Sequence, residues 1–127
     1  MSKVTDFKAY AQIQRQPDEL ARLLDAPEPV SEAAEALAGA QRLFTVGTGT
    51  SFNAALLTAH WLRTTGREAS AWTAYDFAVY GPELQPGDAA IVYSHTGRKQ
   101  YSQRSLERVH AAGVPSVWIT ATNPDAN

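Results

Sequence analysis

The sequence predicts an α/β fold with three layers, in which helices cover both faces of a parallel β-sheet. Short apolar segments alternate with amphipathic segments from residue 42 onward, and this alternation is typical of a parallel sheet with helical crossovers. Two of the apolar segments lead directly into turns rich in glycine and hydroxyl residues, at residues 47–51 and 94–99. A glycine-containing turn between a strand and a helix start is expected at such crossovers.

The first part of the chain predicts a helical arm. Apolar side chains recur at helical spacing over residues 6–25, and Pro17 is expected to divide this helix. A second helix is predicted over residues 31–38, with Ser31 as its N-cap, because the Pro-Glu-Pro run at residues 27–29 breaks the chain before it. We therefore expect two short helices joined at this break.

The remainder of the chain carries the alternating pattern. We divide the sequence into an arm, residues 1–39, and an α/β domain, residues 40–127. The predicted strands are residues 42–46, 68–73, 88–93 and 114–120, and the predicted helices are residues 50–64, 75–80 and 100–112. In the first of these helices the inward face is expected to comprise Phe52, Ala55, Leu56, Ala59 and Leu62.

The right-handed crossover rule favours a flavodoxin-like strand order, in which the first and third strands are neighbours. Both hydroxyl-rich turns then lie at the carboxyl ends of adjacent strands, where open α/β sheets bind ligands. A fourth strand followed by a turn at residues 122–127 leaves an exposed sheet edge. We expect a domain truncated after the fourth strand of a longer protein; the alternative is a small domain whose edge a partner subunit closes.

The two turns have the composition of an anion-binding site. They read Gly47-Thr48-Gly49-Thr50-Ser51 and Ser94-His95-Thr96-Gly97-Arg98-Lys99. Hydroxyl groups, free backbone N–H groups and helix N-termini together favour phosphate. Two cations at a helix start oppose the helix dipole unless an anion is present. The alternative for the first turn is an ordinary connection in which Thr50 or Ser51 caps the helix.

Other chemistries are excluded by composition and motif. The formal net charge of −2 argues against general binding to nucleic acid or to a membrane surface, and the chain has no cysteine for thiolate chemistry. No His or carboxylate pair has metal-ligand spacing, so we expect no metal. Phe52 stands where a dinucleotide-binding fingerprint needs its third glycine. We expect no cofactor.

The three histidines differ in their surroundings. His95 lies inside the second turn and is the candidate for ligand contact. His60 flanks the apolar face of its helix and is interpreted as a packing or interface residue. His110 falls in the last turn of a helix, where a cation is favoured by the dipole. The three tryptophans are expected in the core or at an interface.

At the two turns the chain resembles the sugar isomerase (SIS) domain family. That family has a G-T-S turn after its first strand and an S-x-[ST]-G turn after its third, which are residues 49–51 and 94–97 in this sequence. Residues 13–20 look like the opening of the isomerase half of glucosamine-6-phosphate synthases. The resemblance extends from about residue 13 to residue 122.

The resemblance implies that the turns hold the phosphate of a sugar, such as a hexose or hexosamine 6-phosphate. Carried over by motif position, the binding residues are Gly49, Thr50, Ser51, Ser94, His95, Thr96, Gly97 and Lys99. The family commonly continues Gly-Glu-Thr where this chain has Gly97-Arg98-Lys99, which makes the pocket more cationic. His95 is the one candidate for acid–base catalysis.

The implied function is a phosphosugar-binding domain of an aldose–ketose isomerase or an aminosugar-forming enzyme. The alternative is a non-catalytic sugar-phosphate sensor. The family's acid–base residues lie largely in a second SIS domain, which 127 residues cannot hold, so we expect no complete reaction from this chain alone. We further expect a cytoplasmic homodimer that binds neither nucleic acid nor membrane.

Overall fold

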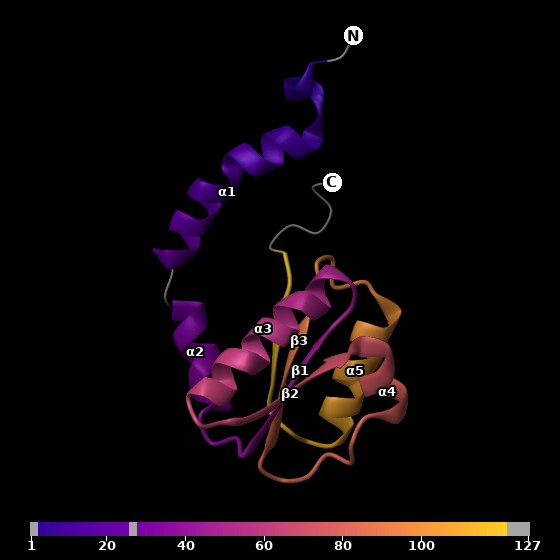
Figure 1. Cartoon of the computed structure of the whole chain (residues 1–127). Helices are drawn as coiled ribbons and strands as arrows, with labels where there is room; N and C mark the ends of the chain where they lie inside the picture. The colour runs from indigo at the N-terminus through magenta and orange to yellow at the C-terminus, as the bar shows by residue number, and fades with distance from the viewer. Residues whose placement is uncertain (1–2, 26–27, 122–127) are drawn as a thin grey trace. The chain divides into compact units, whose positions relative to one another are not determined.

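The structure is a computed structural model that describes residues 3–25 and 28–121 (Figure 1). It divides into two compact units, Met1–Ala34 and Glu35–Asn127, which we describe separately. Within the described ranges, no helix has the length and apolar character that crossing a bilayer requires.

The first unit is helical, as predicted, but its helices begin and end differently. A 3-10 turn, η1 (Val4–Asp6), precedes α1 (Lys8–Leu24), and Pro17 lies inside α1 without dividing it. Good helix formers on both sides of Pro17 offset the one backbone hydrogen bond that proline removes. None of the described residues of α1 is buried.

The next helix, α2 (Glu28–Leu37), crosses the boundary between the units and starts before the predicted residue 31. Pro29 is tolerated because it lies in the first turn, where a backbone N–H has no helical acceptor. Ser31 therefore lies inside α2, and the prediction that it is the N-cap is wrong.

The second unit contains a four-stranded parallel sheet. Its strands are β1 (Arg42–Gly47), β2 (Glu68–Thr73), β3 (Asp88–Tyr93) and β4 (Ser116–Ile119), in the spatial order β2-β1-β3-β4. The predicted adjacency of the first and third strands is confirmed by the register, which pairs Arg42 with Asp88 and Val46 with Val92. β4 is shorter than predicted because the Val114 N–H bonds back to the Val109 carbonyl of α5 rather than to the sheet.

Helices cover both faces of the sheet, which confirms the three-layer fold class. α3 (Thr50–Thr64) packs on β1 and β2, while α4 (Ala74–Tyr80) and α5 (Gln100–Ala111) lie on the other face (Figure 1). The core on the α4–α5 side includes Phe44, Val46, Ala74, Phe77, Ala90, Val92, Leu106, Val109 and Val114. The core on the α3 side includes Leu43, Ala59, Ala69 and Ala89.

The inward face of α3 was predicted in part. Ala55 and Ala59 are fully buried, and the buried Thr45 hydroxyl donates to the Ala55 carbonyl at 2.7 Å, which ties α3 to β1. Leu56 was also placed on this face, yet it is 47% exposed. It follows Ala55 by one residue, which turns its side chain about 100° around the helix axis.

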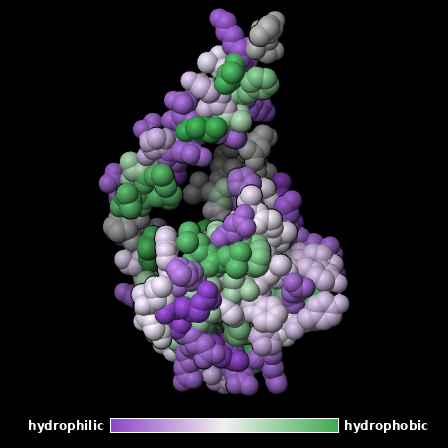
Figure 2. Space-filling model, viewed as in Figure 1, coloured by the Kyte–Doolittle hydropathy of each residue, from purple (hydrophilic) through white to green (hydrophobic). Residues whose placement is uncertain are grey.

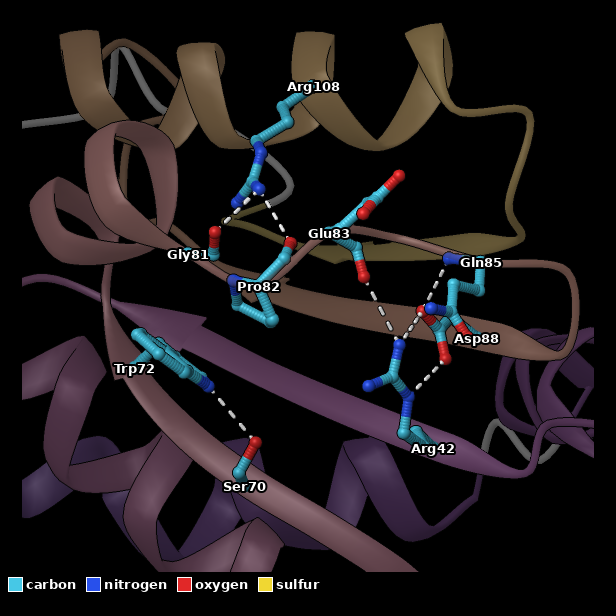
Figure 3. A network of polar contacts seen from close by, with 9 residues as sticks. All are labelled: Arg42, Ser70, Trp72, Gly81, Pro82, Glu83, Gln85, Asp88 and Arg108. Atoms are coloured by element: carbon cyan, nitrogen blue, oxygen red, sulfur yellow. Dashed lines mark hydrogen bonds and ion pairs between the residues drawn. The ribbon is translucent and has the colours of Figure 1, made fainter.

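A bidentate ion pair joins β1 to β3 at their amino ends. The Nε and Nη2 atoms of Arg42 each donate to Asp88 at 2.7 Å, and Asp88 is 3% exposed (Figure 3). The Gln85 N–H also donates to Asp88 at 2.7 Å, and the Glu83 carbonyl accepts from Arg42. The hydrogen bond from Arg42 lowers the pKa of Asp88, so the carboxylate stays charged although it is buried.

Arg108 of α5 fixes the end of α4. Its guanidinium donates to the carbonyls of Gly81 and Pro82 at 2.7 and 2.6 Å (Figure 3). It also donates to the Phe77 carbonyl at 2.5 Å. The Phe77 carbonyl lies in the last turn of α4 and the other two follow the helix, at the end where backbone acceptors lack helical partners. Arg42 and Arg108 thus hold the two ends of the connection from α4 to β3.

Candidate functional site

The two hydroxyl-rich turns line one pocket at the carboxyl ends of β1 and β3. This loop pocket has a volume of about 270 Å³ and is lined by Thr48, Gly49, Thr50, Ser51, Tyr93, Ser94, His95, Lys99 and Ser102. Six of the eight predicted binding residues are therefore brought together. Thr96 and Gly97 do not line it: the Thr96 hydroxyl accepts from the Arg98 N–H, and Gly97 turns the chain at φ +69°.

A second cavity adjoins the loop pocket. This outer pocket, of about 330 Å³, shares Thr50, Ser51, Tyr93, Ser94 and His95 with it and extends to Ala54, Ile119, Thr120 and Ala121. The Tyr93 hydroxyl lies 2.6 Å from the Thr58 hydroxyl, which holds the tyrosine ring at the boundary of both cavities. The loop pocket is thus lined mainly by polar residues, and the larger outer pocket beside it adds the apolar side chains of Ala54 and Ile119.

Two glycines shape the first turn for different reasons. A Cβ on Gly47 would overlap the backbone C and O atoms of Ser51. Only glycine therefore allows β1 to approach the start of α3 this closely. Gly49 adopts φ +60° as the N-cap of α3, a conformation that side chains disfavour. Thr50 and Ser51 lie inside α3, so the alternative in which one of them is the N-cap is wrong.

The helices that begin at the pocket have no side-chain caps. Neither Gly49 of α3 nor Lys99 of α5 makes a side-chain capping bond, and neither first turn contains an acidic residue. By contrast, the hydroxyl of Thr73 caps α4 by accepting from the Asp76 N–H at 3.1 Å. Two helix N-termini at one pocket give it positive potential that suits an anion.

Two buried serine hydroxyls in the loop pocket have no hydrogen-bond partner among the described residues. Ser94 is 2% exposed and Ser102 is 1% exposed, and neither side-chain oxygen has a partner within residues 3–25 and 28–121. The Ser94 N–H bonds to the Ile119 carbonyl at 3.0 Å, which fixes the backbone from which its hydroxyl projects. Because buried polar groups are nearly always paired, these two hydroxyls mark a place for a further polar group.

Sequence reasoning missed Ser102. It lies in the first turn of α5, three residues after Lys99, and residues three apart share a face of a helix. That spacing is the signal that could have found it. Its burial depends on how α5 packs, however, and a local motif carries no such information.

The charge of the lining residues also favours an anion. Lys99 lines the loop pocket, and among the residues that the structure describes no aspartate or glutamate lines either pocket. His95 is exposed at the boundary of both pockets, and its carbonyl accepts from the Ala121 N–H at 3.1 Å and from the Thr120 hydroxyl at 3.3 Å. These bonds hold the second turn against the end of β4.

Solved structures with the same fold include sugar-phosphate enzymes and a regulator. A tagatose-6-phosphate ketose/aldose isomerase from Escherichia coli matches with a TM-score of 0.79 at 22% identity, over 99% of this chain and 37% of its own. The C-terminal domain of glucosamine-fructose-6-phosphate aminotransferase from Francisella tularensis matches with a TM-score of 0.77 at 18% identity, over 96% and 37%. The sugar isomerase domain of an RpiR transcription factor from Sphaerobacter thermophilus matches with a TM-score of 0.74 at 22% identity, over 91% and 67%.

The chain thus spans little more than a third of the two enzyme structures. No curated protein sequence matches it. The model of the SIS domain family, however, matches residues 36–126, which confirms the resemblance drawn from the two turns. The chain belongs to the SIS domain family.

Proposed function

We propose that the loop pocket binds the phosphate group of a phosphorylated sugar, a hexose or hexosamine 6-phosphate. The observation that carries this proposal is the pair of buried, unpartnered hydroxyls of Ser94 and Ser102 in a pocket that also holds Lys99. Phosphate oxygens accept several hydrogen bonds, and bonds to an ionised acceptor are the strong ones. The family membership and the names of the two enzymes of similar fold support the same ligand class.

The sugar ring would occupy the outer pocket. His95 borders both cavities and is placed to exchange a proton with a bound sugar. A parent protein would complete an aldose–ketose isomerisation or an aminosugar synthesis with acid–base residues from elsewhere. The arm would comprise residues 1–39 and the phosphosugar domain residues 40–127, in a cytoplasmic homodimer without metal or cofactor.

The test is ligand-induced stabilisation of the full chain. Glucose 6-phosphate and glucosamine 6-phosphate at millimolar concentration should raise the Tm, because a ligand that binds the folded state alone stabilises it. Unphosphorylated glucosamine should leave the Tm unchanged, and Lys99→Met should reduce the shift. No shift with any hexose phosphate, or an equal shift with unphosphorylated sugar, would overturn the proposal.

A sensor role is the second candidate, and the similarity to the RpiR domain favours it. In this reading the same pocket binds the sugar phosphate, but no proton transfer follows. The arm contains few basic residues and no evident recognition helix, which disfavours DNA binding by this chain itself. Conversion of a bound aldose phosphate to a ketose phosphate by the full-length parent protein would exclude the sensor role.

A further inference from the structure

The outer pocket has an apolar wall to which three elements contribute. Tyr93 is the last residue of β3 and pairs in register with Ile119 of β4, so the two side chains lie on the same face of the sheet. Ala54 lines the same cavity from α3. Of these three residues, Tyr93 is the one that also lines the loop pocket. It therefore stands between the proposed place of the phosphate and that of the sugar.

The hydroxyl of Tyr93 is held by α3. It lies 2.6 Å from the Thr58 hydroxyl, in a partly buried hydrogen bond. Ser51, Ala54 and Thr58 follow the i, i+3, i+7 spacing of one helix face, so the side of α3 that lines the pockets also anchors the tyrosine. Because Thr58 engages the hydroxyl, the part of Tyr93 that remains for a ligand is its aromatic ring.

The cavity beside this ring suits the carbon chain of a sugar. Residue 54 is an alanine, and its small side chain leaves open the outer pocket of about 330 Å³. Sugars carry C–H groups between their hydroxyls, and an aromatic ring offers a large apolar surface for such groups. Inorganic phosphate has no C–H group and gains nothing from the ring.

We propose that Tyr93 is the specificity-determining residue of this site: its ring packs against the carbon chain of the sugar, and Thr58 is the positioning residue that holds the ring. The inference rests on the proposed function and deepens it, because it states how the site distinguishes a sugar phosphate from free phosphate. Ser94, Ser102 and Lys99 line the loop pocket and would contact the phosphate of either ligand. Tyr93 acts on the sugar alone.

Paired titrations of the full chain with glucose 6-phosphate and inorganic phosphate test the assignment, with Kd taken from the ligand dependence of the Tm. Tyr93→Leu should raise the Kd for glucose 6-phosphate about 10-fold, because a ligand loses the apolar contact of part of an aromatic ring. The Kd for inorganic phosphate should not change. Ala54→Leu fills the cavity from a helical position that accepts leucine, and it should have the same effect if Tyr93→Leu does not fold.

Two substitutions are matched controls. Tyr75→Leu makes the same change on α4, which covers the opposite face of the sheet. Asn53→Leu adds the same side chain to α3 as Ala54→Leu does, but at an exposed position. Hydrophobic surface already gathers over α3 (Figure 2), so one more leucine there changes its character little. Both controls should keep the wild-type Kd for both ligands.

Conservative replacements test the role of Thr58. Thr58→Val removes the hydroxyl and should raise the Kd for glucose 6-phosphate about 3-fold, whereas Thr58→Ser keeps the hydroxyl and should retain the wild-type Kd. Tyr93→Phe should match Thr58→Val. The double variant should bind no more weakly than either single variant, because all three lack the same hydrogen bond. An unchanged Kd in Thr58→Val would overturn the positioning role.

The outcomes separate this inference from the proposed function. A wild type that binds no hexose phosphate would overturn both. A wild type that binds glucose 6-phosphate no more tightly than inorganic phosphate would overturn the role of Tyr93 alone, as would unchanged Kd values in both Tyr93→Leu and Ala54→Leu. An equal loss of affinity for inorganic phosphate in these variants would also overturn it, because Tyr93 would then support the loop pocket as a whole.

Discussion

Replacing Ser94 by alanine should affect folding and binding in opposite directions. In the free chain, the Ser94 hydroxyl is buried and has no hydrogen-bond partner among the described residues. A buried unpaired hydroxyl costs about 1–3 kcal/mol relative to a satisfied one, and water in the pocket recovers part of that cost. We therefore expect the free energy of unfolding of Ser94→Ala to stay constant or to rise by up to about 1 kcal/mol.

The effect on ligand affinity should be larger and unfavourable. A hydrogen bond to a charged acceptor contributes about 1.5–3 kcal/mol, and every 1.4 kcal/mol changes Kd tenfold. The Kd for glucosamine 6-phosphate should accordingly rise roughly 10- to 100-fold in Ser94→Ala. Ser102→Ala should raise the Kd in the same way, because Ser102 lines the same pocket as Ser94 and its hydroxyl also has no hydrogen-bond partner among the described residues.

Ser105→Ala is the matched control on the same helix as Ser102. Ser105 is fully buried, but its single O–H is shared between the Tyr101 carbonyl at 2.8 Å and the Ala74 carbonyl at 3.1 Å. Its removal should lower the free energy of unfolding by about 1 kcal/mol and leave Kd unchanged. Urea unfolding and isothermal titration calorimetry measure the two quantities. Loss of stability in Ser94→Ala with an unchanged Kd would refute the reasoning.

Three further substitutions test the frame around the pocket by urea unfolding. Gly47→Ala should lower the free energy of unfolding by about 1–3 kcal/mol, because the added Cβ would overlap the Ser51 backbone. A free energy of unfolding within about 0.5 kcal/mol of the wild-type value, as is typical of neutral surface substitutions, would contradict this prediction. Arg42→Met should cost about 3 kcal/mol, because it leaves the Asp88 carboxylate buried without its cation. Because Arg42 lowers the pKa of Asp88, the stabilisation by the Asp88 carboxylate is complete above about pH 4 and is lost as the pH falls through the pKa of the folded state. This loss of stability in acid should be smaller in Arg42→Met. An identical dependence of stability on pH in the two proteins would contradict the assignment. Arg108→Met should lower the free energy of unfolding by about 2 kcal/mol, because partly buried carbonyls after α4 lose their donor. An unchanged urea midpoint would argue against that role.

The strands and their order were predictable because parallel strands, buried on both faces, read as continuous apolar runs. The turns that follow β1 and β3 were found for the same reason, since a strand end fixes where a turn begins. Helix starts were less predictable. Pro17 and Pro29 were both interpreted as helix breaks. Pro17 is nevertheless accommodated within α1 because good helix formers surround it, and Pro29 is compatible with α2 because it lies in the first turn.

The side-chain environment was the hardest part to predict. α3 is apolar around most of its circumference, so periodicity could not decide whether Leu56 faces the sheet or the exposed side. Trp61 and Trp118 were expected in the core or at an interface, and they are 60% and 42% exposed. Ser102 could be identified only from the packing of α5, which places it in the same pocket as Ser94.

The Arg42–Asp88 pair has a consequence for how this domain can change over evolutionary time. It joins the first residues of β1 and β3, whereas the loop pocket begins where the same two strands end. The side chains that secure the strands and those that meet the ligand therefore occupy opposite ends of the sheet. Mutations at one end are then nearly additive with mutations at the other. Such a division lets the turns diversify toward new anions while the opposite end preserves the architecture.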